Sequence, residues 1–210
     1  LIEQFVEVIK KAREAGIPVI TIDAGPSPAN ADVTSNPWEI GIQQGLALLQ
    51  FLKDEKGKIV EFYNPGYRPC DIRRDSFRNV IKWFPGIEII AEARAVYPNT
   101  VPEAKAKMEA LLKQYPKGAI DGVYANYDLE GIGALQAILE AKRTEIVIVG
   151  SDCEEPALEA IKQGGPFKAS VSQDAYGMGY EAAIHIMRVL RGQEIPSTIY
   201  LPTILVTKDN

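Results

Sequence analysis

The sequence predicts an α/β protein organised around a doubly wound parallel sheet. Two observations lead to this fold class. Short apolar runs alternate with amphipathic segments of helix length along most of the 210 residues. The alternation is most regular between about residues 57 and 172, where five strands are expected. Strands separated by helices form parallel βαβ units, and right-handed crossovers place the helices on both faces of the sheet.

The opening segment predicts one helix followed by one strand. Ile2, Phe5 and Ile9 recur at the spacing of one helix face. Gly16 and Pro18 form a helix stop signal. Residues 18–22 are a continuous apolar run, which is typical of a parallel strand covered on both faces. No further strand is expected before residue 57, so this segment cannot complete a sheet of its own.

Helix caps and apolar periodicity locate the remaining elements. Asn36 is expected to cap a helix whose first residue is Pro37, and Thr100 with Glu103 forms a capping-box pattern at the start of another. The expected strands span residues 57–63, 87–93, 121–125, 145–149 and 168–172, followed by an extended segment over 200–207. The other expected helices span residues 71–84, 129–142, 155–163 and 176–191.

Together these elements predict one complete doubly wound domain, residues 37–173, preceded by residues 1–36 as the remainder of another domain. The helix within residues 174–201 is expected to return to that first domain or to its hinge, with residues 202–210 as the final strand. A partial domain exposes an apolar sheet edge and face, which favours self-association.

Composition argues against several functional classes. With 23 basic and 28 acidic residues the chain carries a net charge of −5, so it lacks the basic footprint of a nucleic-acid-binding protein. No apolar run is long enough to span a membrane. Two cysteines and one histidine predict neither a disulfide framework nor a zinc site. Glycine-rich phosphate-binding motifs are missing, which argues against a nucleotide. No metal or cofactor is predicted.

Polar residues follow several of the predicted strands. In open α/β sheets, ligands bind beyond the carboxyl ends of the strands, so these residues are expected to share one rim. They are Asp23, Asn126, Tyr127, Asp128, Asp152 and Gln173. For Asp128 and Asp152, capping of the following helix is an equally good interpretation.

Arg73 is the most informative residue of the helix predicted over residues 71–84. It lies four residues before Phe77 and extends the apolar stripe toward the helix N-terminus, where a cation opposes the helix dipole. A buried charge needs a partner. That partner is either a polar ligand or, in the alternative interpretation, an aspartate of the rim in a structural salt bridge. The neighbouring Arg74 is expected to be solvated.

This combination of side chains suits a sugar. Carboxylates and amides exchange hydrogen bonds with adjacent hydroxyl groups, and arginine offers a planar fork of donors. Aromatic faces pack against the apolar C–H faces of a sugar ring. For Tyr127, Tyr67, Tyr97 and Trp38, simple loop packing is the commoner role, and Tyr127 is the favoured platform among them. His185 lies mid-helix among apolar residues and is expected to be structural, so no general base is assigned and no enzyme is predicted.

Short motifs also occur in a characteristic order along nearly the whole chain. They are AGIPVITID at residues 15–23, Arg73 with Phe77, NYD at 126–128 leading to GAL at 133–135, VGSD at 149–152, SQ at 172–173 and LVTKDN at 205–210. In this order they resemble the type I periplasmic sugar-binding proteins of ABC transporters, with the ribose-binding proteins nearest.

The resemblance implies which residues bind sugar hydroxyls. They are Asp23, Arg73, Asp152 and Gln173. Tyr127 stands where the family often has asparagine, and Ala24 stands where ribose binders have arginine. These two departures argue against ribose itself and leave room for a different ring or substituent pattern.

The resemblance further implies hinge segments near residues 35–36, 173–174 and 202–203, with closure of two lobes on the sugar. A membrane permease would be the partner. The location would be periplasmic or extracellular, with a lipid anchor in a single-membrane bacterium and a signal peptide outside this chain. Family members begin with further strands and helices, so we expect a fragment.

Two alternatives to this function stay open: the effector-binding domain of a LacI-type sugar-responsive transcription repressor and, less favoured, an enzyme acting on sugars.

Overall fold

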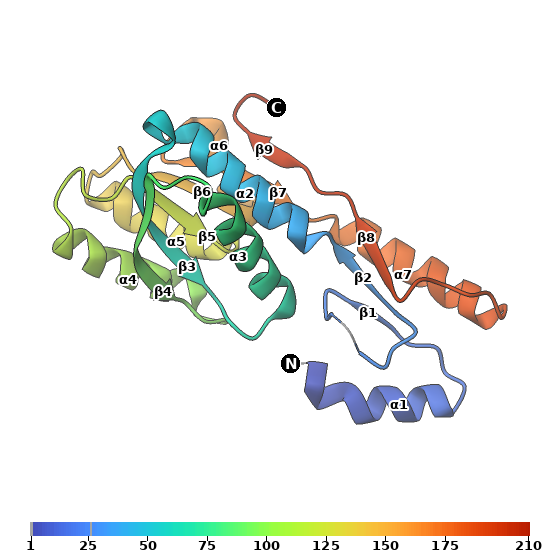
Figure 1. Ribbon diagram of the computed structural model, residues 1–210. Helices are drawn as coiled ribbons and strands as arrows, with labels where there is room; N and C mark the ends of the chain where they lie inside the picture. The colour runs from blue at the N-terminus through green and yellow to red at the C-terminus, as the bar shows by residue number, and fades with distance from the viewer. Residues whose placement is uncertain (1, 26) are drawn as a thin grey trace.

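Two β-sheets organise the chain in the computed structural model, which describes residues 2–25 and 27–210 (Figure 1). The larger sheet has six strands in the order β4-β3-β5-β6-β7-β9. The first five run parallel, and β9 is antiparallel to β7. The strands are β3 (Gly57–Tyr63), β4 (Ile87–Arg94), β5 (Gly122–Ala125), β6 (Val147–Asp152), β7 (Phe167–Ser172) and β9 (Leu205–Thr207). The predicted α/β class with a doubly wound parallel sheet is confirmed.

Helices cover both faces of the larger sheet (Figure 1). They are α2 (Pro37–Phe51), α3 (Arg68–Ile81), α4 (Thr100–Gln114), α5 (Asp128–Glu140) and α6 (Glu155–Gln163), with a short 3-10 turn, η2 (Lys53–Glu55), after α2. On one face, Leu48 of α2 and Phe77 of α3 pack with Tyr124 of β5. On the other, Met108 of α4 packs with Val123 of β5. Val123 and Tyr124 are neighbours in one strand, so they point to opposite layers, and both are fully buried.

Helix starts follow the prediction in one case and depart from it in another. The side chain of Asn36 caps α2 by accepting hydrogen bonds from two backbone N–H groups of the first turn, at 3.2 and 3.4 Å. The capping box predicted at Thr100 and Glu103 is wrong. Glu103 instead accepts a hydrogen bond from the backbone N–H of Val96 at 3.0 Å, and the hydroxyl of Thr100 is hydrogen-bonded to that of Tyr127 at 3.0 Å. Tertiary contacts therefore replace the local cap.

The smaller sheet has three parallel strands in the order β1-β2-β8. They are β1 (Ile20–Ile22), β2 (Ala31–Ser35) and β8 (Thr198–Leu201). The helix α7 (Ala175–Leu190) packs against β1 and β2, where Met178 and Ala182 contact Val33. The helix α1 (Val6–Glu14), preceded by the 3-10 turn η1 (Ile2–Phe5), opens the chain. Neither these helices nor any other in the described ranges is long and apolar enough to cross a membrane.

The strand β2 is missing from the sequence prediction because polar residues interrupt its apolar pattern. All of its residues are buried, Asp32 and Thr34 included. The carboxylate of Asp32 accepts hydrogen bonds from the hydroxyl of Thr21 at 2.7 Å and from the backbone N–H groups of Ala24 and Gly25 at 3.2 and 3.1 Å. Burial of this carboxylate is tolerated because the turn after β1 supplies its donors.

The chain crosses between the two sheets at three places. Ser35–Asn36 joins β2 to α2, Gln173–Asp174 joins β7 to α7, and Pro202–Thr203 joins β8 to β9. These are the segments at which the resemblance implies hinges. Residues 202–210 are predicted to group with the opening segment. Their strand β9 instead belongs to the larger sheet, where it pairs with β7. The extended segment predicted over 200–207 is therefore two short strands in different sheets.

Candidate functional site

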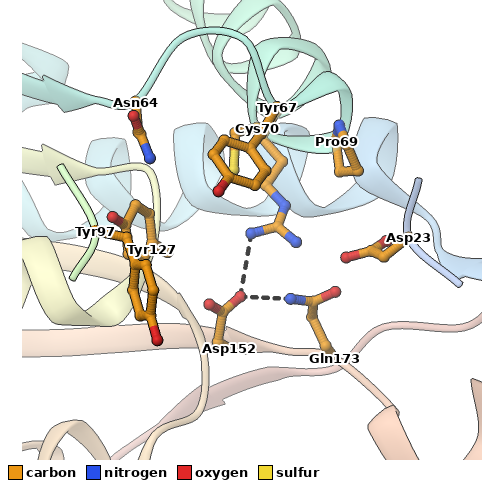
Figure 2. Close-up of a pocket in the computed structure, with 10 residues that line it drawn as sticks. Asp23, Asn64, Tyr67, Pro69, Cys70, Tyr97, Tyr127, Asp152 and Gln173 are labelled. Atoms are coloured by element: carbon orange, nitrogen blue, oxygen red, sulfur yellow. Dashed lines mark hydrogen bonds and ion pairs between the residues drawn. The ribbon is translucent and has the colours of Figure 1, made fainter. Parts of the chain in front are cut away.

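A cavity of about 210 Å³ lies at the carboxyl ends of the strands, where the two sheets meet (Figure 2). Residues from both sides line it. They are Asp23 after β1, Asn64 after β3, Tyr97 after β4, Tyr127 after β5, Asp152 at the end of β6, Gln173 after β7, and Tyr67, Pro69, Cys70 and Arg73 around the start of α3. Parallel strands end at one edge, so residues far apart in the sequence converge there.

An ion pair between the buried Arg73 and the partly exposed Asp152 forms one wall of this cavity. Arg73 is 2% exposed, and its Nη1 donates to Asp152 Oδ1 at 3.1 Å and to Ser151 Oγ at 3.0 Å. Asp152 Oδ1 also accepts a hydrogen bond from Gln173 Nε2 at 2.7 Å, and Figure 2 shows this chain of contacts as dashed lines. Arg73 thus forms the salt bridge with a rim aspartate that the structural interpretation predicts. It also lines the cavity, as the ligand-binding interpretation predicts.

Two buried polar atoms of this group are unpaired within the described residues. Arg73 Nε and Gln173 Oε1 have no hydrogen-bond partner in the part of the chain that the structure describes. Buried polar atoms are normally paired, so an unpaired donor and acceptor at one cavity indicate a polar occupant or ordered water.

Burial and neighbouring charges act in opposite directions on this ion pair. Burial raises the pKa of Asp152, and the guanidinium of Arg73 offsets part of that rise. For Arg73, burial lowers the pKa, but the carboxylates of Asp152 and Asp23 outweigh it and raise the pKa above its usual value. The guanidinium therefore stays charged although it is removed from solvent.

Asp23 is held in place by its backbone and by one hydroxyl. Its φ of 54° lies in the left-handed region, which aspartate tolerates better than most residues. Its backbone N–H donates to Val33 O at 2.9 Å, and its Oδ1 accepts from the hydroxyl of Thr34 at 2.5 Å. Figure 2 shows the carboxylate directed into the cavity.

Asn126 and Asp128, although predicted for the site, lie behind the cavity lining. Asp128 is fully buried, accepts hydrogen bonds from Ser170 Oγ at 2.9 Å and from the backbone N–H of Glu154 at 2.9 Å, and has a pKa that burial raises well above its usual value. The amide of Asn126 donates to Cys70 O at 2.8 Å. Both side chains therefore support the elements that carry the site.

Several lining residues are missing from the sequence prediction. Asn64 follows β3 directly and is nearly buried, yet nothing in its local pattern distinguishes it from a loop residue. Pro69 and Cys70 line the cavity because α3 begins at Arg68, three residues before the predicted start. Tyr97 and Tyr67, less favoured than Tyr127 on sequence, line the cavity together with it.

The prediction that Arg74 is solvated is wrong. It forms a cluster with Arg78, Glu92 and the fully buried Glu61, and its guanidinium lies 3.9 Å from the ring centroid of Tyr63. Glu61 points toward α3 from the middle of β3, where an apolar residue would be usual. The cluster ties α3 to β3 and β4, and it thereby fixes the helix that carries Arg73.

A two-lobed α/β fold with a polar and aromatic cavity between its sheets defines a class of ligand-capturing protein. The chain belongs to the periplasmic binding protein domain family, which matches residues 3–194. The predicted resemblance is confirmed.

Known relatives are sugar and polyol import proteins. The chain is 28% identical to the D-apiose import binding protein of Actinobacillus succinogenes, over 89% of this chain and 60% of that protein. It is 32% identical to a putative rhizopine-binding protein of Rhizobium meliloti, over 96% of this chain and 67% of that protein. A solved ABC transporter solute-binding protein from Agrobacterium vitis with bound allitol is 37% identical, with a TM-score of 0.90, over 97% of this chain and 71% of that one.

The match covers most of this chain but only part of its relatives. The chain spans between 55% and 67% of the length of the first four curated relatives. Those relatives are binding proteins and not enzymes.

Proposed function

We propose that the chain forms the larger part of a solute-binding protein that captures a monosaccharide or related polyol between its two lobes and presents it to an ABC importer. The observation that supports this most is the cavity itself. It combines the Arg73–Asp152–Gln173 chain of contacts with three tyrosines at the meeting point of two sheets. Hydroxyl-rich ligands need both features, donors and acceptors for the hydroxyls and aromatic surfaces for the C–H faces.

Closure about the three crossing segments would complete the site. Asp23 follows β1 of the smaller sheet, whereas Arg73 in α3 and Asp152 at the end of β6 lie on the side of the larger sheet. A ligand that contacts both sides is bound better in the closed form, so it shifts the population toward closure. The closed form would be the one that a membrane permease recognises, and no bond in the ligand would be broken.

The repressor alternative has the same architecture, but the relatives are import proteins, which favours transport. An enzyme is less well supported. The thiol that lines the cavity, Cys70, has a pKa that burial raises to about 12, so it is a poor nucleophile at neutral pH. We accordingly infer a periplasmic location, or an extracellular one with a lipid anchor in a single-membrane bacterium.

Ligand binding is expected to raise the melting temperature. At a ligand concentration one hundred times Kd, binding adds about 2.7 kcal/mol to the free energy of unfolding, which corresponds to roughly 5–10 °C for a chain of this size. The measurement is a thermal shift across pentoses, hexoses, alditols, cyclitols and amino sugars, with amino acids as negative controls. A flat profile across the whole panel would contradict the proposal.

Self-association through the smaller sheet is a further part of the proposal. Within the described residues β1 has β2 as its one strand neighbour, and Ile22 in β1 is 47% exposed. A free apolar edge recruits another strand. Sedimentation velocity is expected to show a concentration-dependent dimer that the Ile22→Lys variant weakens. A monomer at every concentration tested, or a dimer unaffected by Ile22→Lys, would contradict it.

A further inference from the structure

The charges around the cavity do not balance. Two carboxylates, Asp23 and Asp152, line it together with one guanidinium, Arg73. The guanidinium is committed to Asp152 and to Ser151 through the contacts described above. Asp23 makes no ion pair with any residue in the described ranges, and its hydrogen-bond donor from a side chain is the neutral hydroxyl of Thr34. Asp23 therefore has no ion-pair partner of its own within the described residues, although its charge interacts with that of Arg73.

No nearby cation is placed to remove this imbalance. The residue after Asp23 is Ala24, which carries no charge. Arg68 is exposed, and its side chain lies over Gly25, so close that a methyl group on that glycine would be 2.4 Å from Arg68 Cδ. There it lines a separate, smaller cavity with Asp32. Within the described ranges no cation is paired with Asp23, so its carboxylate is free to pair with a cationic group of a ligand.

The position of Asp23 indicates which part of a ligand would supply that charge. In Figure 2 the carboxylate points into the cavity from the side opposite Tyr97 and Tyr127. A ring packed against these tyrosines directs a substituent of its far edge toward Asp23. When the lobes close, solvent leaves and an unpaired carboxylate becomes costly. A hydroxyl group can donate one hydrogen bond to it but leaves the charge in place.

We propose that the cavity selects a sugar or polyol bearing a protonated primary amine, with the ammonium group bound by the carboxylate of Asp23. The inference depends on the proposed function, because it specifies the ligand class of the same site. An ammonium group both donates hydrogen bonds and neutralises the charge, and such charge-assisted hydrogen bonds are about twice as strong as neutral ones. Arg73, Asp152 and Gln173 then serve the neutral hydroxyls.

Matched ligand triads test this inference by calorimetry on the full chain. Each triad contains a hexose, its 2-amino-2-deoxy form and the N-acetylated form, for glucose, galactose and mannose, with inositol and an aminocyclitol as a further pair. In the triad whose ring fits the cavity, the amine is expected to bind at least about tenfold more tightly than its two neutral counterparts at pH 6.5. The preference should fall as the pH rises through the pKa of the amine.

Two variants test whether Asp23 causes the preference for the amine. Asp23→Asn is expected to reduce the affinity ratio of amine to neutral ligand to about one. Glu88→Gln removes one negative charge from an exposed position outside the cavity and should leave the ratio unchanged. A preference that survives Asp23→Asn would overturn the assignment.

The outcomes separate this inference from the proposed function. If neutral sugars bind as tightly as the amines or more tightly, the amine inference is wrong while sugar binding stands. If neither the triads nor any member of the wider panel binds, the proposed function fails and the amine inference fails with it.

Discussion

Arg73→Ala is expected to abolish ligand binding and to lower the free energy of unfolding by about 3–5 kcal/mol. Arg73 is 2% exposed and holds Asp152 and Ser151 at hydrogen-bond distance. Removing it leaves the carboxylate of Asp152 without its cation at the cavity wall, and an uncompensated charge in such a place is strongly destabilising. Urea denaturation and calorimetry with the best ligand of the sugar panel measure the two effects.

A double variant separates the structural role of Arg73 from its binding role. Arg73→Met combined with Asp152→Asn removes both charges, so the stability lost in Arg73→Ala should largely return. Asparagine suits position 152 because the backbone there has a φ of 103°. Binding should remain undetectable, because the guanidinium donors are still missing. A double variant that binds sugar as well as the unmodified chain would show that the ion pair is structural alone.

Gly41→Ala is expected to destabilise the fold by about 3 kcal/mol, the upper part of the usual range for overpacking. Gly41 lies in the contact between α2 and α3. A methyl group at this position would be 2.1 Å from the backbone oxygen of Arg73 and 2.7 Å from Ser76 Cβ. Neither neighbour can move away without shifting α3. The same shift displaces Arg73, so ligand affinity should fall as well.

Gly179→Ala is the matched control for this variant. Gly179 is also inside a helix, α7, but a methyl group there meets nothing within 4 Å. Alanine exceeds glycine in helix propensity by about 1 kcal/mol, so Gly179→Ala should be neutral or stabilising. Urea denaturation of both variants gives the comparison. Equal effects of the same sign would mean that the contact between α2 and α3 is not what excludes a side chain at position 41.

Sequence patterns predict those elements whose stabilising contacts are mainly apolar. The strand β3 spans residues 57–63 as expected, and α6 spans residues 155–163 as expected, because each has a periodic apolar pattern with clear breaks. The strand β2 was missed for the opposite reason. Its buried polar side chains, Asp32 among them, are acceptable only because donors from the turn after β1 reach them.

The candidate site likewise has features that the sequence predicts and features that it does not. The convergence of Asp23, Asp152 and Gln173 could be predicted, because parallel strands all end at one edge. The roles of the three consecutive residues after β5 could not. Tyr127 faces the cavity, whereas Asn126 and Asp128 are used behind it. Successive side chains leave the backbone in different directions, and the direction is set by the local turn.

The sequence alone determined the fold class, the rim at which polar residues gather, and the need of Arg73 for a partner. These follow from periodicity and from the cost of burying charge, which depend on residue type and spacing. Only the tertiary structure decided that the partner of Arg73 is Asp152, that Arg74 joins Glu61, and that Asp23 has no ion pair within the described residues. Pairing depends on distances between side chains that the sequence keeps far apart, and those distances exist only once the two sheets are assembled.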